Sequence, residues 1–162
     1  MCIRDRADGA LMAEAWSRGL TALRGAQAPA LEAAIRVYVQ TDVPTDMVSE
    51  AGPTGAQVAG LFSGFADAEI VMLDDLLGLD WAAVPRDGRR TIVASTHRMR
   101  YGANAGQWRP DLHLVLWNPF QALDVQGPTV VSWGYADGAL AALKSWLQGE
   151  LAVTATSPVS LG

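Results

Sequence analysis

Polar and aromatic side chains that can bind a hydroxyl-rich ligand follow several short apolar runs of this sequence. They are Asp42, Asp46, Asp74, His97, Arg98, Arg100, Tyr101, Asn118 and Tyr135. Carboxylates and amides accept hydrogen bonds from hydroxyl groups, and aromatic faces stack on C–H surfaces. Such a set can contact a sugar directly, or it can hydrogen-bond across an interface between two domains. The sequence favours the interdomain use and leaves direct sugar contact open.

Local pairing is the simplest role for several of these residues. Arg98 and Arg100 are expected to form ion pairs with Asp42 or Asp46 across neighbouring loops, and an anion site is the alternative. Asn118 precedes a proline, so its amide is expected to cap the backbone where the chain turns.

Metal, nucleotide and serine-hydrolase chemistry find no support in the sequence. His97 and His113 lack the spacing and the third ligand of a zinc site, and His113 fits an ordinary strand residue. The adjacent Asp74 and Asp75 could bind a cation, but neighbouring side chains point in different directions, which favours a solvated loop. Neither a phosphate-binding glycine loop nor a Gly-x-Ser-x-Gly elbow occurs. We therefore predict no metal site and no cofactor.

Short strands and amphipathic helices must position these side chains. Strands are predicted at 20–24, 35–40, 70–73, 91–96, 113–117 and 129–133, and helices at 8–19, around 58–65, at 76–84 and at 136–148. Short apolar strands that alternate with helices predict a three-layer α/β/α sandwich around a mostly parallel sheet of five to six strands, flavodoxin-like. Because ligands approach such sheets at the carboxyl ends of the strands, the polar residues should form one rim.

Composition narrows the class of protein. The 162 residues are 50% hydrophobic and 18% charged, with a net charge of −5. An acidic chain without a Lys/Arg cluster predicts no nucleic-acid partner, and the lack of a long apolar run predicts no membrane partner. Residues 1–6 match the translation of a transposon end used in sequencing libraries, so we interpret them as a scar that holds the single cysteine, Cys2. Residues 7–162 then form one α/β domain of a longer natural chain.

The last third of the chain carries a family resemblance. A strand is followed by Asn118-Pro119-Phe120, the next strand by Trp133-Gly134-Tyr135, and an amphipathic helix by Gly149-Glu150, before the chain closes with Ser157–Leu161. This order resembles the C-terminal domain of family 3 glycoside hydrolases, over most of residues 10–162. Gln121 stands where the family has an aspartate after Asn-Pro-aromatic, and Ser157 stands where it has a leucine. The first change puts any polar role of that aspartate in doubt.

The resemblance implies an accessory role. In this family the aspartate nucleophile lies on an N-terminal (β/α)8 barrel, whose motifs are missing here. The β-glucosidase branch takes its acid/base from a Glu-Gly-x-Asp-Arg run, where this chain has Asp74-Asp75-Leu76-Leu77; the β-N-acetylhexosaminidase branch uses a barrel histidine. The resemblance thus implies the latter branch, no catalytic residue in this chain, the barrel as partner and a carbohydrate substrate shared with it. The chain alone is expected to be inactive.

Two other functions stay open. The chain could be a stand-alone, non-catalytic flavodoxin-like binding or interaction module. It could also be a small independent enzyme that uses Asp42, Asp74 and His97. If a barrel covers the domain, residues 8–24 should expose an apolar face.

Overall fold

A mixed sheet of six described strands, in the order β1-β6-β5-β4-β2-β3, forms the centre of the molecule. The computed structural model describes residues 3–42 and 52–161. The strands are β1 (Thr21–Leu23), β2 (Ala34–Gln40), β3 (Asp67–Leu73), β4 (Arg90–Ser95), β5 (Leu112–Val115) and β6 (Thr129–Val131). Among the described strands, β1 alone runs antiparallel to its neighbour, β6, and the other pairings are parallel. The predicted mostly parallel sheet is confirmed.

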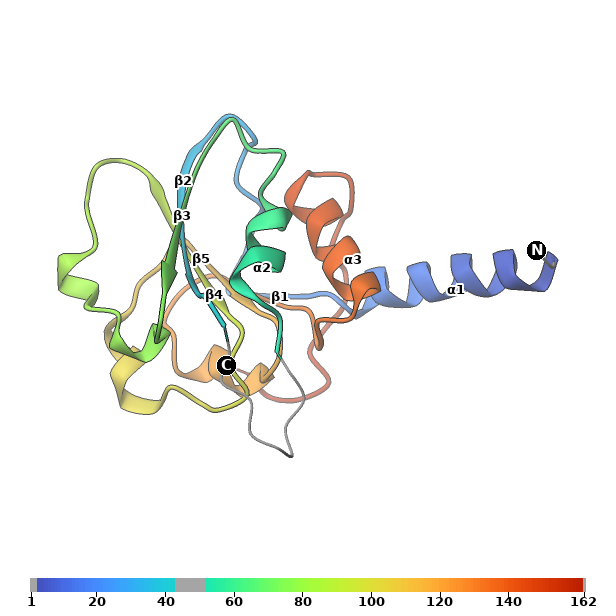
Figure 1. Ribbon diagram of the computed structural model, residues 1–162. Coiled ribbons are helices and arrows are strands. Elements are labelled where there is room, and N and C mark those ends of the chain that lie inside the picture. The colour runs from blue at the N-terminus through green and yellow to red at the C-terminus, as the bar shows by residue number, and fades with distance from the viewer. Residues whose placement is uncertain (1–2, 43–51, 162) are drawn as a thin grey trace.

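Helices cover the two faces of the sheet in different ways. On one face lie α2 (Gly55–Leu61) and α3 (Asp137–Leu147), while α1 (Ile3–Gly19) projects away from the body (Figure 1). The other face is covered by segments that contain the short 3₁₀ helices η1 (Leu76–Gly78), η2 (Trp81–Ala83), η3 (Gly102–Gln107) and η4 (Pro119–Leu123). The three predicted layers are present, although the second outer layer is built of single turns. None of the described helices has the length and apolarity needed to cross a membrane.

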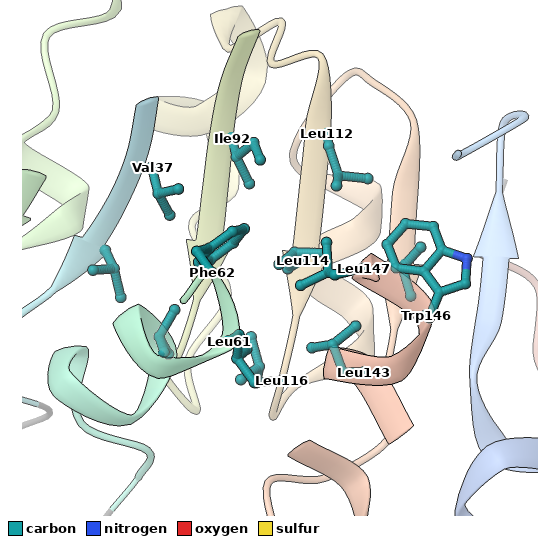
Figure 2. Packing of buried hydrophobic residues seen from close by; sticks show 14 of the residues in the cluster. Val37, Leu61, Phe62, Ile92, Leu112, Leu114, Leu116, Leu143, Trp146 and Leu147 are labelled. Atoms are coloured by element: carbon teal, nitrogen blue, oxygen red, sulfur yellow. The ribbon is translucent and has the colours of Figure 1, made fainter. Parts of the chain in front are cut away.

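The helical face encloses the larger part of the core. Leu61 and Phe62 of the α2 segment and Leu143 of α3 pack against alternate residues of the central strands, such as Ile92 and Leu114 (Figure 2). The α2 face predicted from its spacing is confirmed, because Val58, Leu61, Phe62 and Phe65 are all buried. This burial of apolar area is the main force that holds α2 and α3 on the sheet.

The first turn of α2 is fixed by its sequence. Thr54 and Gln57 form a capping box, in which each side chain accepts a hydrogen bond from the other residue's amide, at 3.2 and 2.9 Å. The Gly55 amide donates to the Thr41 carbonyl at 2.7 Å, and a Cβ on Gly55 would lie 2.9 Å from the Gln40 carbonyl oxygen. Glycine therefore lets α2 begin directly against the carboxyl end of β2.

The inner face of α3 differs in part from the prediction. Leu143 and Leu147 are buried and Leu140 is partly buried, as expected, but Ala141 is exposed. The buried positions are Ala139, Ala142, Leu143, Trp146 and Leu147. This set follows the i, i+3, i+4 spacing of one helix face, which places Ala141 on the solvent side.

The end of α3 is confirmed. Gly149 has a φ of 76°, and the amides of Gly149 and Glu150 donate to the carbonyls of Trp146 and Ser145 at 3.0 and 2.9 Å. This is the Schellman arrangement that a glycine after a helix makes possible.

The prediction of one helix at 76–84 is wrong. Two separate 3₁₀ turns stand there, and each begins at an aspartate whose carboxylate accepts a hydrogen bond from the amide two residues later. Asp75 binds the Leu77 amide at 2.9 Å, and Asp80 binds the Ala82 amide at 3.0 Å. Such local side-chain bonds compete with a continuous helix, so Asp80 starts a new turn instead of extending the first one.

Candidate functional site

The parallel strands bring the predicted rim residues to one edge of the sheet. Following the strand order, Asp74 follows β3, Asp42 follows β2, His97 follows β4, Asn118 follows β5 and Tyr135 follows β6. A further candidate, Asp46, lies outside the described residues. These five residues therefore lie at one edge of the sheet, as the strand directions predict, while their role in binding stays a prediction.

Residues 97–101, which we name the rim loop, are held by side chains of the neighbouring segment around η4. Asn118 donates from Nδ2 to the Arg98 carbonyl at 2.8 Å. Gln121 donates from Nε2 to the carbonyls of His97 and Met99, at 2.8 and 2.7 Å. Asn118 is the N-cap of η4 and Gln121 lies within it, three residues later, so both side chains lie on the same side of this 3₁₀ turn.

Asp124 continues this row three residues later and binds the far end of the rim loop. Its carboxylate, 5% exposed, accepts from the Tyr101 amide at 2.9 Å and from the Arg100 guanidinium through Nε at 3.1 Å and through Nη2. This hydrogen-bonded carboxylate raises the pKa of Arg100. Arg100 thus pairs with Asp124, an ion pair that was not expected from the sequence. The expected pairing with Asp46 involves a residue outside the described ones. Asp124 was not among the predicted candidates, because no sequence pattern indicates that it lies beside the rim loop.

Gln121 holds the rim loop from inside the protein. Its side chain is completely buried, and its amide group supplies two donors to two backbone carbonyls. A carboxylate accepts hydrogen bonds and cannot donate to these carbonyls. An amide is therefore the group this position requires, and Gln121 acts on the rim loop from within the protein.

The rim loop presents some candidates outward and buries another. Arg98 and Arg100 are exposed, as is Met99 at 59%. Tyr101, by contrast, is 5% exposed and packs against Trp108 with ring centroids 5.4 Å apart, and burial raises the pKa of its hydroxyl. Tyr101 therefore belongs to the core of the second face, and its prediction as a residue that contacts a ligand or a partner is wrong.

The remaining candidates along the edge differ in how exposed their side chains are and in how many contacts they make. Asp42 and Asp74 are exposed. Asn118 is partly buried and caps the Phe120 amide through Oδ1 at 3.0 Å, as predicted, so both ends of its amide group are bound. Tyr135 is partly buried, with its ring 5.0 Å from that of Trp117. The exposed carboxylates and this aromatic pair, together with the exposed part of the rim loop, can be reached by a ligand or a partner surface.

A serine and a histidine that the sequence analysis did not connect lie side by side in the sheet. Ser95 Oγ and His113 Nε2 are 2.7 Å apart, on the same face of β4 and β5. This is the contact that a nucleophile makes with its base. Both residues are fully buried, however, and burial lowers the pKa of His113 to about 3. A substrate has no access to this pair, so it is a buried polar contact with a neutral imidazole, which agrees with the expected strand role of His113.

Metal chemistry is not supported by the described part of the chain. No group of three or more histidine, cysteine, aspartate or glutamate side chains lies close enough to hold an ion there. The carboxylate of Asp75, considered for a cation, caps η1.

Comparison with known proteins gives relatives in structure only. No protein-family model matches this chain, and no curated protein matches it either. Among solved structures, the beta-glucoside phosphorylase BglX has the same fold, with 14% identity and a TM-score of 0.60, over 92% of this chain and 31% of that one. A fungal multi-domain GH3 beta-N-acetylglucosaminidase, described with a GCN5-related glucosamine N-acetyltransferase region, aligns at 12% identity and a TM-score of 0.60, over 96% of this chain and 19% of that one. This chain, which spans less than a third of either protein, thus has the fold of one part of each.

Proposed function

We propose that this chain is an accessory domain of a family 3-like glycoside hydrolase and packs on a (β/α)8 barrel that carries the nucleophile. One observation carries the proposal. Nearly the whole chain shares its fold with part of two much longer proteins, and the names of both refer to β-linked sugars. The motifs around Asn118, Trp133, Gly149 and Ser157, which resemble that family, support the same conclusion.

The site supports an accessory role over a catalytic one. Asn118, Gln121 and Asp124 are engaged in holding the rim loop, and Asp75 caps a turn. These groups build a fixed surface at the edge where a ligand approaches an open α/β sheet. Such a surface suits the wall of a sugar cleft whose reacting carboxylate comes from another domain.

Helix α1 supports a covering partner. It projects beyond the sheet (Figure 1), and Leu11 and Met12 on it are 65% and 52% exposed. Of the range 8–24 for which an apolar exposed face was expected, only the α1 part shows it, because Leu20 is fully buried and Thr21–Leu23 forms β1. Contact with a second domain would remove these side chains from water, which is favourable in proportion to the apolar area buried.

Within the proposal, the β-N-acetylhexosaminidase-like branch is favoured. The sequence after β3 is Asp74-Asp75-Leu76-Leu77, without the glutamate run of the other branch. The full enzyme would then hydrolyse a terminal β-linked N-acetylhexosaminide, with its acid/base supplied by the barrel.

Two measurements test the proposal. The 162-residue chain, assayed with nitrophenyl β-glycosides, should show no turnover. Turnover that disappears in Asp74→Asn would overturn the accessory role. The coding DNA upstream of residue 7 should encode a barrel in frame, and the protein expressed from the whole gene should hydrolyse nitrophenyl N-acetyl-β-glucosaminide. A stop codon and a start site there would instead support the stand-alone module.

A further inference from the structure

Trp133 adopts a backbone conformation that its side chain disfavours. Its φ is 58°, in the left-handed region that suits glycine, although Gly134 is the next residue. A bulky residue there is an outlier, and such strain persists only where the surrounding structure fixes it. Strained residues of this kind concentrate at binding and catalytic sites, so the strain marks the neighbourhood of Trp133 as a candidate ligand site.

The surroundings fix both the backbone and the ring of Trp133. The indole Nε1 donates to Thr21 Oγ1 at 2.9 Å, and Thr21 is 1% exposed. On the backbone side, the Ser132 amide donates to the Val115 carbonyl at 3.0 Å, and the Ser132 hydroxyl donates to the Gly134 carbonyl at 2.6 Å. The ring is therefore held in one orientation while it stays partly exposed.

An open hollow of about 320 Å³ lies against this ring. Its walls come from the end of α1, the start of β1, the end of β6 and the C-terminal segment, which reaches β1 through a bridge between Thr21 and Ala155. Most of the lining is apolar, with Arg18 and Thr156 as exposed polar groups. Small-molecule pockets span about 300–1,000 Å³, so the hollow has room for a single small ring.

We propose that the hollow is a subsite for one pyranose ring, with Trp133 as its stacking platform. A pyranose has an apolar C–H face, which suits an indole, and ring hydroxyls, which suit the Thr156 hydroxyl and the Arg18 guanidinium. Arg18 is paired with Glu14 at 3.3 Å, but both side chains are largely exposed, so the pair is weak and exchangeable. The choice of a sugar rests on the proposed function. Because β6 ends at the rim edge, the ring lies near the edge that would face the carbohydrate in the proposed function.

The test uses the ¹⁵N-labelled 162-residue chain, whose six indole N–H signals are followed by NMR during titration with chitotriose and, separately, cellotriose. The Trp133 signal should shift saturably with at least one sugar. Trp133→Gly removes the ring and suits a positive φ, so its backbone spectrum should stay folded while binding weakens by at least about tenfold. Trp81→Ala, at a partly exposed tryptophan in η2, should leave binding unchanged.

The outcomes separate this inference from the proposed function. Absence of binding to both sugars, or equal binding by Trp133→Gly and the wild type, overturns the subsite even where a barrel lies upstream. Binding that depends on Trp133 supports the subsite even where the upstream DNA encodes no barrel, in which case only the proposed accessory role fails.

Discussion

At the scale of single residues, the candidate site depends on groups that never meet a ligand. Gln121 and Asp124 lie inside the protein, yet they fix the path of the rim loop that presents Arg98 and Met99. When a buried donor or acceptor loses its partner, the loss of folding free energy exceeds the net contribution of the hydrogen bond, because the desolvation of the remaining group is no longer offset. The rim loop should therefore be sensitive to small changes behind it.

Gln121→Glu tests this dependence directly. The change keeps the size of the side chain, removes two donors to backbone carbonyls and places a carboxyl group in a fully buried site. We expect the free energy of unfolding at pH 7 to fall by about 3 kcal/mol, measured by urea denaturation. Gln126→Glu makes the same chemical change at an exposed position, and should stay within about 0.5 kcal/mol of the wild type. Equal stability of the two variants would contradict the role assigned to Gln121.

At the scale of elements, the sequence predicted the helices and strands that follow from a periodic pattern of apolar residues. The strands and α2 follow from apolar runs and spacing, and the end of α3 follows from Gly149. The 3₁₀ turns were missed because they depend on single hydrogen bonds, such as that from the Leu77 amide to Asp75.

The candidate site was also predictable only in part. Its placement at one edge follows from strand direction, which the alternation of elements predicts. Its internal contacts do not, because the pairing of Arg100 with Asp124 depends on the neighbouring positions of β4 and β5. The burial of Tyr101 likewise depends on where η3 and Trp108 lie in space.

Gly138 tests how α1 is attached to the body. A Cβ at this position of α3 would overlap the Trp16 indole of α1. Alanine favours a helix over glycine by about 1 kcal/mol, but here Trp16 must move, and α1 must move with it. Gly138→Ala should therefore release α1, and trypsin should cleave at Arg18 faster than in the wild type.

A matched variant separates the two effects. Gly60→Ala lies in α2 with open space around the new methyl group, so only helix propensity acts there. It should raise the free energy of unfolding by up to about 1 kcal/mol and leave cleavage at Arg18 unchanged. Identical cleavage rates for the two alanine variants would show that Trp16 does not anchor α1.

At the scale of the whole molecule, two buried or half-buried polar contacts link global stability to pH in separate ranges. Arg36, 6% exposed, binds Asp87 at 2.7 Å and holds the pKa of that carboxyl down at about 2. Its stabilisation is present above the ordinary pKa of 3.8 and is lost as the pH falls toward 2. His113 also loses its contribution as the pH falls, but at higher pH and for a different reason: burial favours its neutral imidazole, whereas the ion pair favours the charged carboxylate of Asp87.

Acidification from pH 7 to pH 5 therefore isolates His113. The pKa of His113 is about 3 in the folded protein and 6.5 in the ordinary state, so in this range the unfolded chain binds a proton that the folded chain does not. The free energy of unfolding should fall by about 2 kcal/mol between the two pH values. In His113→Gln most of this slope should vanish, whatever its stability at pH 7, while Asp87→Asn should flatten the curve only below about pH 4. Urea denaturation at pH 7, 6 and 5 measures the slopes, and an unchanged slope in His113→Gln would mean that protonation of other groups drives the loss.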